Sequence, residues 1–134
     1  MADSHILFVC TDCRLRAPTA AKIYDRRPDL EVDCGGLGDL TKRPVTEEMV
    51  EWADIIFVME PRHVERIGRK WPALVKDKRL VNLGVPDEFA YMEGELVELL
   101  VRRLAKYIGE PGSHFEVGGG DQSSTPKTSG SEER

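Results

Sequence analysis

Residues 6–18 of the chain read ILFVCTDCRLRAP, and this stretch indicates a buried strand, a tight loop and the start of a helix. The apolar run from Ile6 to Val9 has the β-branched and aromatic character of a parallel strand covered on both faces. Pro18 suits the first turn of a helix, where its missing N–H group leaves no hydrogen bond unmade. We therefore predict that the loop leads directly into a helix N-terminus.

Cys10 and Arg16 bracket this loop and are separated by five residues. A loop of that length can direct its backbone N–H groups at a tetrahedral oxyanion, and the helix dipole adds positive potential at the same point. A thiolate at Cys10 would lie at the base of the loop, and Arg16 can bind two oxygens as a fork. Such surroundings are expected to lower the pKa of Cys10 from about 8.5 towards roughly 3.5–7.5. The alternative is a buried cysteine that packs as a small apolar side chain. The residues expected to surround the anion are Thr11, Asp12, Cys13, Arg14 and Leu15.

Composition and charge restrict the function classes. The chain has 134 residues, of which 40% are hydrophobic and 32% charged, as in a single domain with a core of its own. Its formal net charge of -5, with no block of basic residues, argues against nucleic-acid binding. Charges interrupt every apolar run, so we expect no membrane association. Residues 1–5 lack a basic region followed by an apolar segment, which predicts a cytoplasmic protein.

Three cysteines, Cys10, Cys13 and Cys34, occur without an export signal, so a structural disulfide framework is not expected. Zinc is also a poor interpretation, because Cys10-x-x-Cys13 has no second pair and the three histidines are scattered. We therefore predict no metal and no other cofactor. Catalytic, redox-active or simply buried cysteines remain.

Hydrophobic patterns predict strands that alternate with helices. Strands are expected at 6–9, 30–34, 55–59 and 79–83, and helices at 17–26, 46–53, 61–71 and 93–108. This alternation predicts an α/β domain over residues 1–108, with a four-stranded parallel sheet in the order 2-1-3-4 and helices on both faces. Residues 109–134 carry almost no apolar side chains, and we expect a disordered tail.

Polar residues follow three of the predicted strands. Cys10 follows the first strand, Glu60 the third and Asp87 the fourth, so all three are expected at the ligand-binding edge of the sheet. Asp87 is the natural general acid for the departure of an alkoxide or phenoxide. Glu88 competes for this role, and Asp87 can also be an ordinary turn residue beside Pro86.

With these motifs in the same order, the chain resembles the low-molecular-weight protein tyrosine phosphatases, in particular a short bacterial subgroup. The resemblance covers about residues 5–108. Its motifs are the Cys10-to-Arg16 loop after the first strand, the turn at 34–36, the strand at 52–60 and the Asp87-Glu88-Phe89 loop.

The resemblance implies a metal-independent phosphomonoesterase that acts on phosphotyrosyl proteins through a phosphocysteine intermediate. Cys10 would be the nucleophile, Arg16 with the loop N–H groups would stabilise the transition state, and Asp87 would protonate the leaving group. Phe89 and Tyr91 would form a wall for the substrate ring. The opposite loop, residues 37–44, has no aromatic residue.

The loop departs from the family pattern at three positions. Cys13 stands where the family usually has an asparagine that holds the loop's shape, and Ala17 stands where it has a serine that donates to the thiolate. Asp12 adds a negative charge beside an anion site. These changes predict slower turnover, and Ala17 predicts a higher pKa for Cys10.

Cys13 also supports other functions. The Cys10-x-x-Cys13 spacing is used in dithiol redox chemistry, and arsenate reductases share this phosphatase fold. Cys34, at the end of the neighbouring strand, would be a third thiol within reach, and a disulfide would protect the nucleophile from over-oxidation. A redox-regulated phosphatase, a thiol-dependent arsenate reductase and a non-catalytic phosphate-binding module are therefore the alternatives.

Overall fold

Four parallel strands form one sheet in the spatial order β2-β1-β3-β4. The computed structural model describes residues 4–111. Its strands are β1 (Ser4–Cys10), β2 (Leu30–Gly36), β3 (Ile55–Val58) and β4 (Arg79–Asn82). The predicted strands, their parallel pairing and their order are confirmed.

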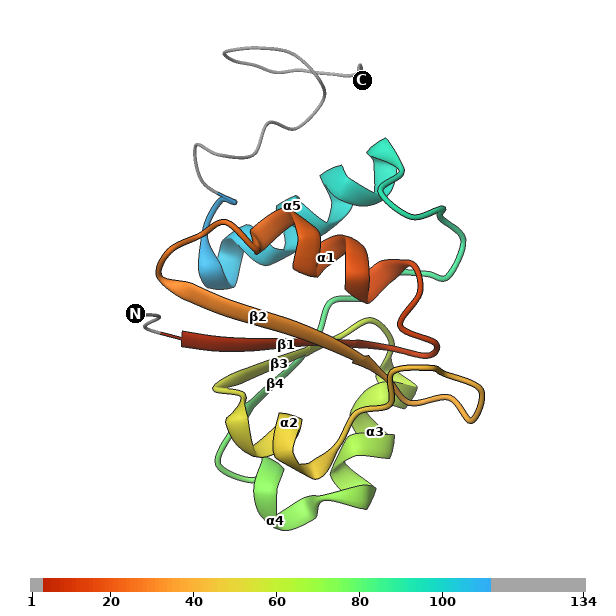
Figure 1. The fold of residues 1–134 in the computed structure, drawn as a ribbon, viewed down its shortest axis with the longest axis vertical. Helices are drawn as coiled ribbons and strands as arrows, with labels where there is room; N and C mark the ends of the chain where they lie inside the picture. The colour runs from red at the N-terminus through yellow and green to blue at the C-terminus, as the bar shows by residue number, and fades with distance from the viewer. Residues whose placement is uncertain (1–3, 112–134) are drawn as a thin grey trace.

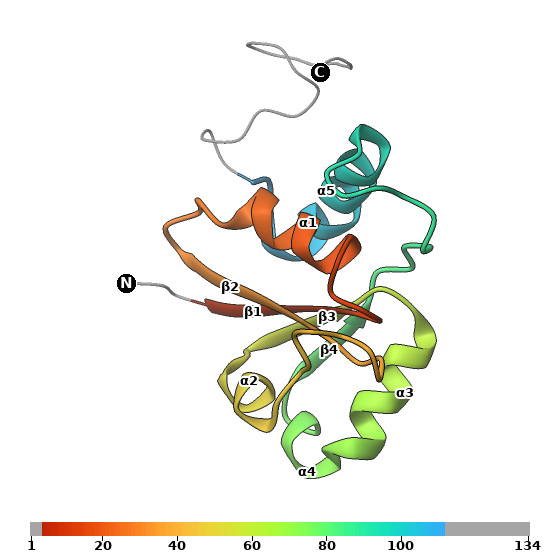
Figure 2. The ribbon, with the colours of Figure 1, turned by 45° about the vertical axis from the view of Figure 1, so that its right-hand side comes forward.

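Helices cover both faces of the sheet, as predicted. On one face lie α1 (Arg16–Tyr24) and α5 (Gly94–Ile108). On the other lie α2 (Glu47–Trp52), α3 (Pro61–Lys70) and α4 (Pro72–Val75). Figure 1 shows the sheet between these two layers, and the rotated view in Figure 2 shows the same arrangement.

The alternation of side chains along the central strands divides the core in two. Ile6, Phe8 and Cys10 of β1 point into the cluster beneath α1 and α5. Leu7 and Val9 point into the cluster beneath the other three helices. All five side chains are buried, which explains why this strand is apolar at every position from Ile6 to Cys10.

The register of the sheet aligns the ends of its strands. Cys10, the last residue of β1, pairs with Gly36, the last residue of β2. On the other side of β1, Val9 pairs with Val58 at the end of β3. The segments that follow the strands therefore leave the sheet at one edge, where ligands bind in folds of this kind.

The helices differ from the prediction near residue 71. Trp71 has φ −133° and ψ 59°, which ends α3, and Pro72 begins the separate short helix α4. The prediction had no α4. The predicted start of α2 is confirmed, because the Thr46 side chain accepts a hydrogen bond from the N–H of Met49.

The last residue of α5 and the residue after it are held by side chains of α1 and of the turn that follows α1. The Tyr24 hydroxyl donates to the carbonyl of Gly109 at 2.8 Å, and Arg27 Nη1 donates to the carbonyl of Ile108 at 2.8 Å. Residues 112–134 of the predicted disordered tail lie outside the described residues. Within residues 4–111, no helix is long and apolar enough to cross a membrane.

Candidate active site

The loop between β1 and α1 is anchored from outside by the segment that follows β2. Leu37 N–H donates to the carbonyl of Cys10 at 3.0 Å, and Gly38 N–H donates to that of Thr11 at 2.7 Å. Thr41 Oγ1 donates to the carbonyl of Asp12 at 2.7 Å. Three consecutive carbonyls of the loop thus have partners in this segment. The N–H groups of Cys13, Arg14 and Ala17 instead face the Cys10 thiol.

This anchoring needs glycine at the end of β2. A Cβ atom on Gly36 would lie 2.6 Å from Thr41 Oγ1 and 2.7 Å from the carbonyl oxygen of Thr11. The second contact is with backbone, so a larger residue would displace the loop itself. Gly36 is therefore part of the support of the site.

Cys10 lies at the base of the loop and is 2% exposed. Burial raises the pKa of its thiol. The backbone N–H groups of Ala17, Cys13 and Arg14 and the charge of Arg16 act in the opposite direction but do not outweigh burial. The Cys13 N–H points at the sulfur from 3.1 Å. The expected lowering of this pKa is therefore wrong, because sequence spacing shows the donors around the thiol but not its loss of solvent.

Arg16 is the first residue of α1, and its side chain is 2% exposed. Its Nη1 donates to Glu60 Oε2 at 2.6 Å and to the carbonyl of Val85 at 2.7 Å. Its Nε lies 3.9 Å from Asp87 Oδ1. Nη1 of the guanidinium is thus held by Glu60 after β3 and by Val85 after β4. Its Nε faces Asp87.

Glu60 comes directly after β3 and precedes α3. Besides its contact with Arg16, it accepts a hydrogen bond from Arg62 Nε at 2.9 Å. Burial raises the pKa of Glu60, but the two arginines outweigh it, and the pKa lies below its usual value. The sequence placed Glu60 at this edge of the sheet without assigning it a role. In the structure it is the anionic partner that positions Arg16.

His63 is a buried contact of the loop that the sequence analysis missed. Its Nδ1 accepts the N–H of Glu60 at 3.2 Å, so its Nε2 carries the proton and donates to Thr11 Oγ1 at 3.0 Å. Burial lowers the pKa of His63 to about 4, which keeps the ring neutral. Arg62 Nη2 also donates to Thr11 Oγ1 at 3.0 Å. With two donors on its oxygen, the Thr11 hydroxyl is left to donate its own hydrogen.

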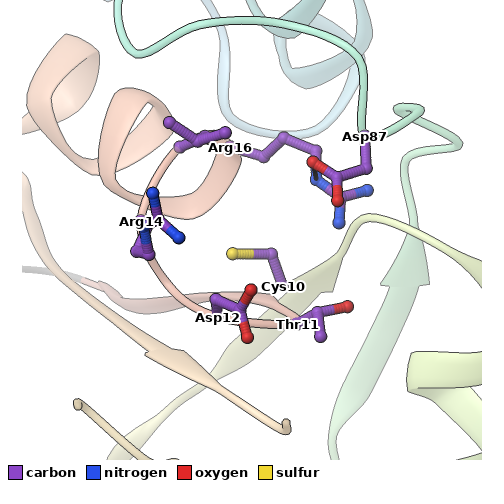
Figure 3. Close-up of a pocket in the computed structure, with 7 residues that line it drawn as sticks. Cys10, Thr11, Asp12, Arg14, Arg16 and Asp87 are labelled. Carbon is purple, nitrogen blue, oxygen red and sulfur yellow. Dashed lines mark ion pairs between the residues drawn. The ribbon is translucent and has the colours of Figure 1, made fainter. Parts of the chain in front are cut away.

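Asp87 approaches the loop from the segment after β4. Two arginines hold the start of this segment. Arg16 binds the carbonyl of Val85, and Arg103 of α5 binds the carbonyl of Leu83. Figure 3 shows the Asp87 carboxylate beside the Arg16 guanidinium, with the Cys10 sulfur nearby. The Asp87 side chain is 55% exposed, so it lies at the open side of the site.

These side chains enclose a cavity of ≈ 120 Å³. That volume suits one functional group rather than a whole drug-sized ligand. Seven of the predicted site residues line the cavity: Cys10, Thr11, Asp12, Arg14, Leu15, Arg16 and Asp87. The structure thus brings together the thiol, the arginine and the carboxyl group that the sequence placed at one edge.

Two predicted site residues do not line this cavity. Phe89 packs, partly buried, against the core beneath α1 and α5. The side chain of Cys13 contacts Cys34, with 3.2 Å between the two sulfurs. Tyr91, the other aromatic residue of this segment, is 49% exposed. Within residues 4–111, no three histidine, cysteine or acidic side chains are grouped so that they could hold a metal ion.

The four-stranded parallel sheet with helices on both faces has the fold of the low-molecular-weight protein tyrosine phosphatases. One similar structure is the YwlE arginine phosphatase from Geobacillus stearothermophilus, with 24% identity and a TM-score of 0.62, over 78% of this chain and 92% of that one. The low-molecular-weight protein tyrosine phosphatase SP-PTP from Streptococcus pyogenes has 14% identity and a TM-score of 0.64, over 78% of this chain and 93% of that one.

A third similar structure contains phosphate. It is the tyrosine phosphatase Wzb from Escherichia coli K30 in complex with phosphate, with 21% identity and a TM-score of 0.62, over 80% of this chain and 96% of that one. No protein-family model and no curated protein sequence matches the chain.

Proposed function

We propose that this protein is a cysteine-dependent phosphomonoesterase. The proposal rests on three groups that line one small cavity: a buried thiol, a buried arginine and an exposed carboxyl group. Each group has a chemical role in phosphoryl transfer that requires no metal ion. The similarity to solved phosphatases supports the same assignment.

In the first step, the Cys10 sulfur attacks phosphorus, so that a P–S bond forms as the P–O bond breaks. Cys10 reacts as its thiolate, and the N–H groups and guanidinium that lower its pKa against burial also stabilise that thiolate. Asp87 donates a proton to the departing oxygen. In the second step, water attacks the phosphocysteine and Asp87 takes a proton from that water. The P–S bond breaks, Cys10 departs as its thiolate, and phosphate is released.

Arg16 stabilises the charge on the phosphoryl oxygens in both steps. Its guanidinium is held by Glu60 and Val85 before substrate binds, so little reorganisation is needed when the transition state forms. The inward-facing N–H groups of the loop supply further donors. Thr11 adds a hydroxyl whose oxygen is already held by His63 and Arg62.

We propose phosphotyrosyl proteins as the substrate class. The volume of the cavity suits a phosphate group, and Asp87 lies at its open side, where an oxygen of the substrate would project out of it. The exposed ring of Tyr91 follows Asp87 in the chain and is available to contact a substrate ring. The role of Phe89 as part of that wall stays a prediction.

Asp12 favours a second candidate, a phosphoarginyl substrate. Asp12 lines the cavity, and an acidic residue there would attract a cationic leaving group such as a guanidinium. The similarity to the YwlE arginine phosphatase agrees with this candidate. The two candidates share the nucleophile, the arginine and the general acid.

Phosphate release in the presence of a metal chelator tests the proposal. Wild-type protein should release phosphate from an aryl phosphate, and Cys10→Ala should release none. A tyrosine-phosphorylated peptide and its arginine-phosphorylated counterpart then separate the substrate classes, and Asp12→Asn should reduce the rate on the second peptide more than on the first.

Phosphate binding and arsenate reduction by the same protein distinguish the alternative functions. If wild-type protein binds phosphate but releases none from any ester, the protein is a phosphate-binding module. If it instead reduces arsenate with thioredoxin and loses this activity in Cys13→Ser, it is a thiol-dependent reductase. Either result overturns the proposed function.

A further inference from the structure

Cys13 and Cys34 form a close pair of thiols beside the cavity. Their sulfurs lie 3.2 Å apart, although the residues belong to the loop after β1 and to the edge strand β2. Both side chains are partly buried and pack against the core beneath α1 and α5. Because both residues are partly exposed, a small reagent can approach the pair from solvent.

The charges around the pair favour one thiolate and one thiol. The Cys13 S–H donates to Cys34, and this hydrogen bond lowers the pKa of Cys34 and raises that of Cys13. Arg43 adds positive charge, since its Nε donates to the carbonyl of Cys34 at 2.9 Å and its Nη2 pairs with Asp33. Cys34 is therefore the nucleophilic sulfur of the pair.

Cys10 lies next to this pair but is not part of it. Its sulfur accepts the backbone N–H of Cys13, whereas the side chain of Cys13 contacts Cys34. Cys10 is 2% exposed, and burial raises the pKa of its thiol. The three sulfurs thus differ in what they contact and in how readily an oxidant reaches them.

We propose that Cys13 and Cys34 are a redox site that peroxide oxidises to a disulfide between the loop and β2, while Cys10 remains a thiol. Disulfide formation brings the two sulfurs from 3.2 Å to about 2.05 Å. This differs from the pairing that the Cys10-x-x-Cys13 spacing suggests, in which the nucleophile itself is blocked.

The chemistry balances with hydrogen peroxide as the oxidant. The Cys34 thiolate attacks one peroxide oxygen, the O–O bond breaks, and the products are a sulfenic acid and hydroxide, which takes a proton to become water. The Cys13 sulfur then attacks the Cys34 sulfur, the S–O bond breaks, and a second water leaves with the proton of Cys13. In total, two thiols and one peroxide give one disulfide and two waters.

The disulfide would fix the part of the loop that is most strained. Cys13 has φ 55°, in the left-handed region that is unfavourable for a residue with a Cβ atom. Its N–H group nonetheless has to stay in place to contact Cys10. A covalent link to β2 holds this conformation, so the oxidised protein should keep the Cys13 N–H beside a reduced Cys10 and unfold at a higher denaturant concentration than the reduced protein.

Peptide mapping after treatment with about one equivalent of hydrogen peroxide tests the pairing, whether or not the protein is a phosphatase. Trypsin cleaves after Arg14, Arg26 and Lys42, so Cys10 and Cys13 share the peptide 1–14, and Cys34 lies in 27–42. Free thiols are alkylated before digestion. We expect the two peptides to be joined in a product whose mass is two hydrogen atoms below the sum of the two peptide masses, and in which Cys10 is alkylated. A disulfide within peptide 1–14, with Cys34 alkylated, would overturn the proposal.

Two variants complete the test. Cys10→Ala should still form the cross-link, since Cys10 is not in the pair, whereas Cys34→Ser should not. Loss of the cross-link in folded Cys10→Ala, as judged by circular dichroism, would contradict the proposal. If oxidised wild-type protein contains the cross-link but unfolds at the same denaturant concentration as the reduced protein, the proposed support of the loop is wrong.

Discussion

Arg16 Nη1 donates to Glu60 Oε2 at 2.6 Å, and this partly buried ion pair joins the helix after β1 to the end of β3. The guanidinium is therefore positioned by a residue 44 positions away in the sequence. The sheet order makes the contact possible, because β1 and β3 are neighbours and end at the same edge. We regard this pair as the main support of Arg16, the proposed anion-binding group.

Removing the Glu60 carboxylate should reduce activity through Arg16. A hydrogen bond to a charged group contributes about 1.5–3 kcal/mol, so Glu60→Ala should lower kcat/KM on an aryl phosphate by roughly 10- to 100-fold. Glu60→Gln keeps an acceptor for Arg16 and should lose less. The matched control is Glu65→Ala, which removes an exposed carboxylate that pairs with Arg69 on α3. Equal effects of Glu60→Ala and Glu65→Ala would contradict the positioning role.

Replacing Asp87 should affect substrates according to their leaving group. General acid catalysis contributes roughly 10²–10⁴-fold, so Asp87→Asn should strongly slow hydrolysis of phenyl phosphate. It should slow hydrolysis of 4-nitrophenyl phosphate much less, because that leaving group needs no proton. Steady-state rates on both esters provide the measurement. Glu88→Gln, a change in the next residue, should behave as wild type, and a larger loss there would transfer the role to Glu88.

A methyl group at Gly36 should displace the loop. Because its Cβ atom would lie within 2.7 Å of the Thr11 carbonyl, Gly36→Ala should destabilise the fold by about 1–3 kcal/mol and greatly reduce activity. Gly68→Ala is the control, since nothing lies within 4 Å of a Cβ atom there. In the helix α3 that substitution should add about 0.5–1 kcal/mol of stability. Urea unfolding and phosphate release measure both effects, and an active, stable Gly36→Ala would disprove the close approach.

His63 should make stability depend on pH. Its pKa is about 4 in the folded protein and about 6.5 when unfolded, so the unfolded chain binds more protons between these values. The contribution of neutral His63 to the free energy of unfolding is complete above about pH 6.5. It is lost as the pH falls towards 4, which lowers the free energy of unfolding by up to about 3 kcal/mol. Urea unfolding from pH 7 to pH 4 should show a steeper loss for wild type than for His63→Asn. Parallel curves for the two proteins would mean that His63 does not titrate in this way.

The sequence was sufficient to predict the sheet. The cores of β1 and β3 are apolar, and each strand is followed by a helix that has a proline in its first turn. The edge at which Cys10, Glu60 and Asp87 meet follows from that topology. What could not be predicted depends on contacts between distant segments. The Arg16–Glu60 pair, the contact of His63 with Thr11 and the burial of Cys10 all need the folded chain.

Local pattern also failed to show where side chains point. Phe89 is an aromatic residue in a loop near the site, yet it packs against the core. Cys13 has the spacing of a dithiol partner for Cys10, but the register that places Phe8 opposite Cys34 brings Cys34 to the loop instead. The sequence did predict Cys34 as a third thiol within reach, and its 3.2 Å contact with Cys13 confirms this. Which sulfur the Cys13 side chain faces, and the orientation of Phe89, depend on contacts that form only in the folded chain.

Detection of a phosphocysteine on Cys10 is the most direct test of the proposed function. Wild-type protein is mixed with an aryl phosphate, quenched in acid within the first turnover and digested, and the peptide 1–14 is analysed by mass spectrometry. We expect this peptide to carry one phosphoryl group on Cys10, and the corresponding peptide of Cys10→Ala to carry none. Release of phosphate by the wild type without a phosphorylated peptide, or equal release by Cys10→Ala, would contradict it.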